Sequence, residues 1–278
     1  MESRVRGTIS KYQMLEPKDK IMVAVSGGKD SVTLLHILTK IESAFPEAEL
    51  NVITVDEGIK GYRDEALKVA TTNCQELDVK QVIVSFKKMY GYKLDEIVNM
   101  ARGKELAPCS YCGALRRRAL NIAAREAGAN KLATAHNLDD EVQTIILNIL
   151  HGDAPRIARV KPTLDVVHPG LIPRVKPLCQ VPEREVALYA YLKKIEFQNV
   201  PCPYAGTALR SDVRTMLNRM EEKHPGTKFT IFRSMERIRP ALEALAQETE
   251  IRECKLCGEP AAEEICKPCK LLQELSVL

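Results

Sequence analysis

Long apolar runs, tryptophan and a strong net charge are all missing from this 278-residue sequence. A transmembrane helix needs about 20 consecutive apolar residues, so we expect that the chain does not span a membrane. The first ten residues, MESRVRGTIS, lack the apolar centre of an export signal. The net charge of +4 is too small to indicate a nucleic-acid partner by itself. Only local clusters of basic residues could indicate such a partner.

Cysteine is absent before Cys74, and the total of nine cysteines is an odd number. Most of them lie in Cys-x-x-Cys pairs, which indicates metal binding in a reducing compartment rather than a set of disulfides. We therefore expect a cytoplasmic protein. The cysteines are Cys74, Cys109, Cys112, Cys179, Cys202, Cys254, Cys257, Cys266 and Cys269.

Two common nucleotide-binding motifs are also missing from the glycine-containing turn MVAVSGGKDS at residues 22–31. Aligned on its Gly-Lys pair, the turn has Val23 where a Walker A motif requires glycine and Asp30 where it requires serine or threonine. Its two glycines are adjacent, which excludes the Rossmann spacing. The turn still joins an apolar strand to a helix, where free N–H groups and the helix dipole favour phosphate. An ordinary strand-to-helix turn is the alternative.

Short apolar runs alternate with longer helical patterns from residue 20 onward, which predicts a parallel sheet with helices on both faces. The expected strands, read as buried on both faces, are 20–25, 50–56, 80–86, 130–136 and 171–178. The expected helices are 30–42, 61–78, 112–128, 182–195, 208–223 and 228–248. We expect a short helix within 1–19, a doubly wound α/β domain at 20–200, a helical extension at 201–251 and a separate small module at 252–278.

A second polar segment, TAHNLDDEVQTIILNILHGD at residues 134–153, again runs from a strand end into a helix. His136, Asn137, Asp139 and Asp140 would then lie at the carboxyl edge of the sheet, where open α/β folds bind ligands. The alternative is that these acids only cap the helix.

The C-terminal tail reads CKLCGEPAAEEICKPC from residue 254. Its cysteines Cys254, Cys257, Cys266 and Cys269 form two Cys-x-x-Cys pairs, the arrangement of a closed tetrahedral structural zinc site. A tail this short could not bury a core without such a metal. Cys74 continues a helical apolar stripe, and Cys179 ends an expected buried strand, so both are expected in the core.

The motif SGGKDS resembles the PP-loop of ATP pyrophosphatases, which split ATP between the α and β phosphates. Together with residues 134–153, the intervening PCSYCGALRRRAL and the CP at residue 202, it resembles the tRNA 2-thiouridine synthetase family over residues 4–275. The resemblance implies ATP-dependent replacement of a uridine C2 oxygen by sulfur. LNILHGD and CGALRRRALN are closer to the wobble-uridine enzymes than to the T-loop uridine enzymes of this family.

The resemblance also implies roles for individual residues. The predicted ATP and Mg²⁺ site comprises Ala24, Ser26, Gly27, Gly28, Lys29, Asp30, Ser31, Asp56, His136 and Asp139. Asp140 is expected to act in acid–base or metal steps near the uracil. Arg116 cannot shuttle a proton as the lysine of some relatives could, so we expect it to stabilise charge or contact RNA phosphate.

Cys109, Cys112 and Cys202 are expected to hold a 4Fe-4S cluster with one open iron, which in the family would bind the sulfur destined for the uridine. Cys202 lies between two prolines, in a loop rather than a packed face. The alternative is a persulfide and disulfide pair without iron. We favour the cluster because disulfide exchange needs two cysteines and leaves the third unexplained.

The expected partners are tRNA and a sulfur donor, either free sulfide or a ubiquitin-like sulfur carrier protein, and the resemblance alone suggests a homodimer. Candidate RNA phosphate contacts are Lys87, Lys88, Arg156, Arg159, Lys161, Arg210 and Arg214. Arg117 or Arg118 is expected on a solvated helix face.

Two features depart from the family pattern. Relatives usually have glycine where this chain has Ala135, and they usually begin with a zinc module, which was either removed here or is missing from this lineage. The rival functions are a PP-loop amidotransferase-type synthetase, a cytidine thiolase and a non-catalytic zinc-containing RNA-binding protein.

Overall fold

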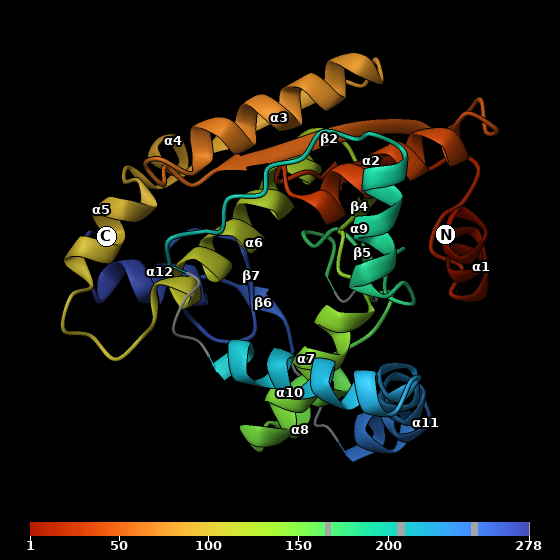
Figure 1. The fold of residues 1–278 in the computed structure, drawn as a ribbon. Helices are drawn as coiled ribbons and strands as arrows, with labels where there is room; N and C mark the ends of the chain where they lie inside the picture. Colours follow the sequence, from red (N-terminus) through yellow and green to blue (C-terminus); the bar gives the residue numbers. More distant parts are fainter. Residues whose placement is uncertain (165–167, 205–208, 246–249, 278) are drawn as a thin grey trace.

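The computed structural model in Figure 1 describes residues 1–164, 168–204, 209–245 and 250–277. Its main sheet has five parallel strands in the order β3-β2-β1-β4-β5, and a small antiparallel pair, β6-β7, lies near the C-terminus. No helix in these ranges is both long and apolar enough to cross a membrane. The elements are α1 (Glu2–Lys11), β1 (Lys20–Ala24), α2 (Lys29–Glu42), β2 (Glu49–Asp56), α3 (Arg63–Glu76), β3 (Gln81–Ser85), α4 (Phe86–Tyr90), α5 (Leu94–Met100), α6 (Pro108–Glu126), β4 (Lys131–Ala133), α7 (Leu138–Leu150), α8 (Ala154–Ala158), β5 (Arg174–Val175), α9 (Glu183–Leu192), α10 (Leu209–Lys223), α11 (Thr227–Leu245), β6 (Arg252–Glu253), β7 (Pro260–Ala261) and α12 (Lys267–Gln273).

Both faces of the central strand β1 are buried, because successive side chains of a strand point to opposite faces. Ile21 and Val23 join the core cluster that contains α2, whereas Met22 joins the cluster that contains α6. Val23 is paired with Val52 of β2 on one side and with Ala133 of β4 on the other. This arrangement confirms the predicted doubly wound parallel sheet, and it brings the carboxyl ends of the strands to one edge.

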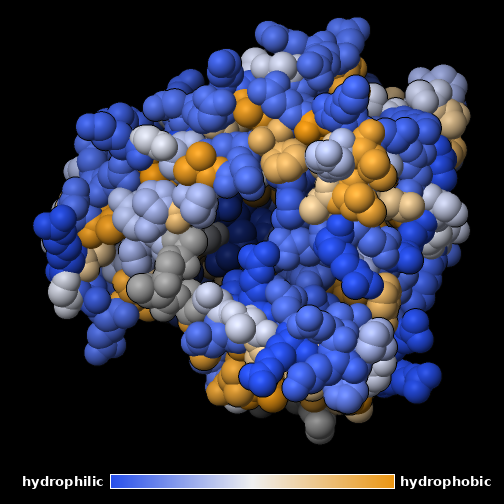
Figure 2. Space-filling view, viewed as in Figure 1, coloured by the Kyte–Doolittle hydropathy of each residue, from blue (hydrophilic) through white to orange (hydrophobic). Residues whose placement is uncertain are grey.

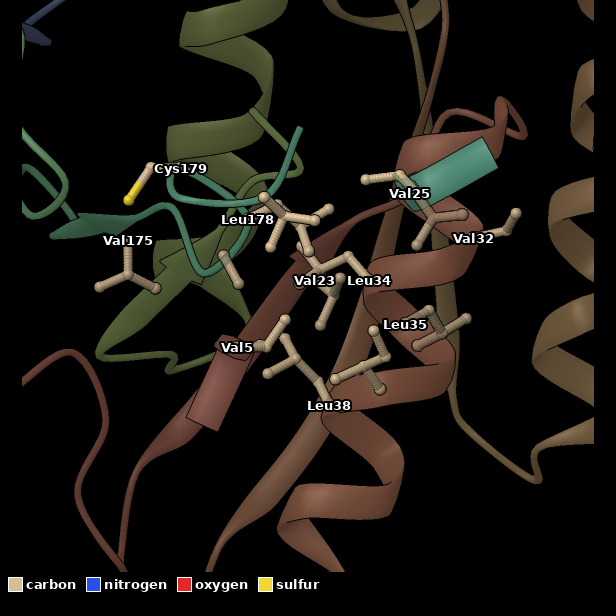
Figure 3. Close-up of a cluster of buried hydrophobic side chains, with 14 of the residues drawn as sticks. Val5, Val23, Val25, Val32, Leu34, Leu35, Leu38, Val175, Leu178 and Cys179 are labelled. Atoms are coloured by element: carbon tan, nitrogen blue, oxygen red, sulfur yellow. The ribbon is translucent and has the colours of Figure 1, made fainter. Parts of the chain in front are cut away.

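The first core cluster lies between the sheet and helices α1, α2 and α9. Figure 3 shows Val23 of β1 close to Leu34, Leu35 and Leu38 of α2, with Val5 of α1 beside them. These side chains are fully buried. Helix α2 begins inside the SGGKDS motif, at Lys29, so its packing against the sheet fixes the position of that motif.

The second core cluster lies on the opposite face of the sheet, under α5, α6 and the C-terminal helix α12. Leu271, Leu272 and Leu275 of the tail are buried in the same cluster as Tyr111 and Leu115 of α6. The tail therefore shares its core with α6, which carries Cys109, and loss of the tail's structure would disturb that helix.

The prediction that residues 80–86 are buried on both faces is wrong. β3 is the edge strand of the sheet and pairs only with β2, and Val82 and Ile83 are 41% and 51% exposed. Cys74 and Cys179 are both buried, which confirms the prediction that they lie in the core. Cys179 does not end a strand, however, because β5 stops at Val175 and Cys179 lies in the turn that follows.

Candidate active site

The PP-loop is a tight turn between β1 and α2 in which Gly27 cannot be replaced without strain. Its φ of +89° lies in the left-handed region, and a Cβ there would lie 2.3 Å from the carbonyl oxygen of Ala66 in α3. The Ser31 hydroxyl donates to the Gly28 carbonyl at 2.9 Å and accepts from the Ser26 N–H at 3.1 Å. These bonds hold the loop closed over the first turn of α2.

The carbonyl groups of the loop are bound from outside, and some of its N–H groups stay available. Arg63 donates to the Ser26 carbonyl at 2.8 Å, and the Gln198 N–H donates to the Gly27 carbonyl at 2.9 Å. Within the described parts of the chain, the N–H groups of Gly27 and Asp30 have no acceptor, whereas the Lys29 N–H faces the Gln198 carbonyl across the isolated parallel bridge of Gly28 with Gln198. Free N–H groups at the start of a helix are what a phosphate group requires.

Lys29 is held at the loop by two carboxylates. Its Nζ atom lies 2.9 Å from Asp30 Oδ2 and 2.7 Å from Glu183 Oε1, and Glu183 also pairs with Arg214 at 2.8 Å. Partial burial lowers the pKa of Lys29, but the attraction of Asp30 and Glu183 outweighs it and the net shift is upward. The ammonium group is therefore charged at neutral pH.

The second motif begins α7 and contacts the first. Asn137 and Asp140 form a capping box in which the Asn137 side chain accepts from the Asp140 N–H at 3.0 Å. The alternative that these residues cap the helix is therefore correct for Asn137 and Asp140. The Asn137 amide also donates to Asp30 Oδ1 at 3.2 Å, so the two motifs meet at the carboxyl edge of the sheet.

Asp139 points into the protein. Its carboxylate accepts from the Glu183 N–H at 2.8 Å and forms an ion pair with Lys228, and both members of that pair are buried. A cavity of about 430 Å³ beside the PP-loop is lined by residues that include Lys29, Asp139, Glu183 and Lys228. Because protein partners occupy Asp139, we expect it to orient α9 and the cavity wall.

Asp140 and His136 face the open side of this edge. Removal from bulk water raises the pKa of Asp140 to about 6, although the Asn137 N–H opposes the shift. Arg210 lies 3.9 Å from the Asp140 carboxylate. The His136 ring is accessible to solvent, but surrounding protein atoms and then Lys176 lower its pKa well below the usual range. At neutral pH the site thus holds a carboxylate beside an uncharged imidazole.

Two further predicted ATP residues lie at the ends of their strands. Ala24 ends β1 and Asp56 ends β2, at the same edge as the loop. Asp56 accepts the Gly58 N–H at 2.8 Å, which closes the turn after β2.

The predicted cysteine triad comes together from two segments. Cys109 and Cys112 lie in the first turn of α6, and Cys202 packs against the core cluster that includes Cys112. The Cys109 thiol lies 3.6 Å from the Tyr204 carbonyl, next to Cys202 in the chain. Tyr204 is held in turn by its hydroxyl bond to Asp95 at 2.6 Å.

The triad is not a site for a single ion. Among the described residues, only the four tail cysteines form a group whose ligand atoms all lie within 4.8 Å of one another. An iron–sulfur cluster binds each cysteine to a different iron, so it accepts sulfurs that are further apart. Burial raises the pKa of both Cys112 and Cys202, so without a metal they stay protonated. Three free thiols from these two segments are the donor set that a cluster with one open iron would use.

Arg116 links the cysteines to a buried carboxylate that sequence reasoning missed. It donates to Cys112 Sγ at 2.8 Å and pairs with Glu57 at 3.0 Å, and Glu57 also pairs with Arg63 at 3.0 Å. The Glu57 side chain is only 5% exposed. Its position directly after Asp56, at a strand end, was the only available signal.

Figure 2 shows a hollow lined by hydrophilic residues on the face drawn in Figure 1, between the positions of α6 and α10. The expected RNA contacts differ in their relation to the site. Arg210 and Arg214 lie at the two motifs, through Asp140 and Glu183. Lys87, Arg156 and Lys161 form ion pairs with Glu96, Asp153 and Glu243, Arg159 binds the Pro155 carbonyl, and Lys88 is exposed.

The tail cysteines form a compact tetrathiol site suited to Zn²⁺. Their sulfurs lie within 4.8 Å of one another, and the Cys266 N–H donates to Cys254 Sγ at 3.2 Å. Arg118 donates to Cys269 Sγ at 3.6 Å and lies over the Tyr90 ring. The expectation of a solvated face is therefore wrong for Arg118, which ties α6 to this site.

Replacement of Cys254 by serine is expected to lower the melting midpoint by about 10 °C or more. A structural zinc site contributes on the order of 10 kcal/mol, and each 1 kcal/mol lost shifts the midpoint of a chain of this size by about 2–4 °C. The measurement is thermal unfolding with zinc analysis on iron-free protein. Cys109→Ser, at an exposed position, is the control. Equal midpoints for both variants would show that the tail needs no metal.

A family model described as the PP-loop domain matches residues 1–221. The chain is 35% identical to the tRNA 2-thiolation protein NcsA of Haloferax volcanii, over 100% of this chain and 91% of that protein. It is 36% identical to the tRNA-5-methyluridine(54) 2-sulfurtransferase of Pyrococcus horikoshii, over 97% and 83%. The solved structure of the U34-tRNA thiolase NcsA from Methanococcus maripaludis, with its 4Fe-4S cluster, is similar with a TM-score of 0.85, 36% identity, and coverage of 99% of this chain and 86% of that one.

Proposed function

The chain belongs to the PP-loop family that includes the tRNA 2-thiolation proteins, and from this we propose that it uses ATP to replace the C2 oxygen of a tRNA uridine with sulfur. The observation that carries the proposal is the direct contact of the two motifs at one edge of the sheet, Asn137 to Asp30 at 3.2 Å. Arg116 and the cysteines lie on the adjoining side, at the start of α6.

The PP-loop is suited to bind the phosphates of ATP. The free N–H groups of Gly27 and Asp30 would donate to phosphate oxygens, and the Lys29 ammonium would neutralise their charge. To bind phosphate, Lys29 must give up its ion pair with Glu183, and Glu183 then keeps its ion pair with Arg214. The Asp30 carboxylate stands beside these groups and would contribute an oxygen to a Mg²⁺ ion that bridges the phosphates.

The chemistry has two displacements. The uridine C2 oxygen attacks the α phosphorus, and pyrophosphate leaves; a sulfur nucleophile then attacks C2, and AMP leaves with the former carbonyl oxygen. Asp140 would accept the proton that the uracil N3–H must lose, because its carboxylate is ionised at neutral pH. The uncharged His136 ring would donate or accept a hydrogen bond nearby without adding charge.

A 4Fe-4S cluster held by Cys109, Cys112 and Cys202 would supply an iron with an open position for the sulfur ligand. Arg116 would stabilise negative charge beside Cys112, since Glu57 fixes its guanidinium from the other side. The persulfide mechanism stays as the alternative: a sulfane sulfur donor, rather than sulfide, leaves its sulfur on one cysteine, and a second cysteine then forms a disulfide with the first as that sulfur is transferred to C2, without iron; a thiol reductant restores both thiols.

We propose the wobble uridine as the target. The relative that modifies position 54 and the U34 thiolase are each 36% identical to this chain, so identity does not separate them. The segments LNILHGD and CGALRRRALN favour the wobble position. The proposed sulfur donor is free sulfide or a carrier protein, and the proposed assembly is a homodimer. A cytoplasmic location fits nine cysteines that are all free.

The test of the proposal is to incubate the protein anaerobically with ATP, Mg²⁺, sulfide and an unmodified tRNA transcript, and to measure AMP and 2-thiouridine. Formation of both products only when tRNA and ATP are present together is expected. AMP formation with a small-molecule substrate instead of tRNA would favour the amidotransferase-type alternative, and no AMP in any mixture would favour a non-catalytic RNA-binding protein.

AMP formation is expected to fall as the pH drops below about 6. The pKa of Asp140 is raised to about 6, so below that pH its carboxyl group is protonated and cannot act as a base. Asp140→Asn should slow AMP formation by about 10²-fold or more and remove the inflection. The pKa of His136 is lowered to about 3, so His136 cannot produce this inflection. The measurement is single-turnover AMP release from pH 5 to 8. An unchanged inflection in Asp140→Asn would assign it to another group.

A further inference from the structure

Positive charge gathers around His136 and the first turns of α6, and most of it is neutralised by the protein itself. Arg116 pairs with Glu57, Lys176 with Glu141 at 2.9 Å, and Arg156 with Asp153 at 3.1 Å, while Arg210 lies 3.9 Å from Asp140. In the described part of the chain, two arginines of this group, Arg117 and Arg174, have no carboxylate partner. Their positive charge is therefore left for a ligand.

Arg174 is anchored so that most of its donors stay unused. It begins β5, and its Nη2 atom donates to the Arg117 carbonyl of α6 at 2.9 Å. A guanidinium group has five N–H donors, and this bond uses one of them. Removal from bulk water and then the charge of Arg117 lower the pKa of Arg174 to about 10, so it is still fully charged at neutral pH.

Arg117 lies back along α6 toward the cysteines. A Cβ built on Gly113 would lie 3.3 Å from Arg117 Nη1, so the missing side chain of Gly113 makes room for the guanidinium beside Cys112. The surrounding protein atoms and then the charges of Arg116 and Arg156 lower the pKa of Arg117. Two arginines held together without a counter-ion repel each other, and a bound anion would remove that repulsion.

We propose that Arg117 and Arg174 form a binding site for one phosphodiester group of the RNA substrate, next to the nucleotide that is modified. Planar guanidinium groups match phosphate oxygens with two parallel hydrogen bonds each. RNA is favoured over the phosphates of ATP because the PP-loop and Lys29 serve those, and because Arg117 lies on the cysteine side of the hollow. This inference rests on the proposed function, since it takes tRNA to be the substrate.

The experiment measures binding of an unmodified tRNA transcript with a wobble uridine at several salt concentrations, without ATP. Arg117→Gln and Arg174→Gln are each expected to weaken binding on the order of tenfold and to lower the salt slope by about 1. Arg6→Gln in α1 is the matched control, because it removes the same charge from an exposed residue. Figure 1 shows α1 on the opposite side of α9 from α6. Arg117 is itself exposed, so its variant tests the site even if Arg174→Gln folds poorly.

Three results would overturn the inference. Both variants binding tRNA as the wild type does would show that the pair contacts no RNA. Weaker ATP binding with unchanged tRNA binding would make it part of the nucleotide site. A wild type that binds no tRNA would remove the proposed function together with this site, and it is recognised before any variant is compared.

Discussion

Lys29→Ala is expected to reduce AMP formation by about 10²- to 10³-fold while tRNA affinity changes no more than about threefold. Loss of one preorganised charge beside the reacting phosphates has an effect of that size on the chemical step. RNA affinity is spread over many basic residues, so one phosphate-loop lysine contributes little to it. The measurements are AMP release under single-turnover conditions and filter binding of a tRNA transcript.

Glu183→Gln separates this role of Lys29 from a purely structural one. If Lys29 only holds α9 through Glu183, both variants should lose activity alike, since each breaks the same 2.7 Å ion pair. If Lys29 binds phosphate, Glu183→Gln should keep AMP formation within about tenfold of the wild type, because the ammonium still has Asp30 beside it. Similar losses in both variants would remove the PP-loop assignment of Lys29.

The fold was predictable because strands and helices alternate strictly, and a parallel sheet is the common result of that pattern. The pattern does not give the order of the strands, and Val82 and Ile83 show the consequence. An apolar run reads as a buried strand, but β3 is at the edge and leaves both residues exposed. Burial of a strand depends on its neighbours in the sheet, which are distant in sequence.

The meeting of Ser26–Ser31 with Asn137–Asp140 was predictable, because each is a short motif at the carboxyl end of a strand. The site was not predictable where charge pairs connect separate elements. Glu183 reaches Lys29 from α9, and Glu57 lies between Arg63 and Arg116. The Glu183–Lys29 and Glu57–Arg116 pairs stand far apart along the chain, and nothing in the local sequence distinguishes these acids from solvated ones. The same holds for Arg118, whose partner Cys269 is in the tail.

Cys202→Ala is expected to abolish 2-thiouridine formation and to remove most of the iron from anaerobically reconstituted protein, while AMP formation with tRNA continues. Two thiolates on α6 cannot hold a 4Fe-4S cluster that needs three protein ligands. The PP-loop is untouched by this change, because Cys202 packs against the hydrophobic core on the α6 face of the sheet. Iron content, AMP and 2-thiouridine are measured on one preparation.

The control for Cys202 is Cys74→Ala, which also removes one thiol, but from the buried side of α3. It should retain iron and thiolation, although the small cavity left behind lowers stability. In the persulfide alternative, wild-type protein without iron would still thiolate tRNA, because two cysteines then suffice and iron is not required. Full 2-thiouridine yield from wild-type protein stripped of iron, with a chelator present throughout, would rule out the cluster; the same yield with a sulfane sulfur donor but not with sulfide would leave Cys202 as the partner of a persulfide on Cys109 or Cys112.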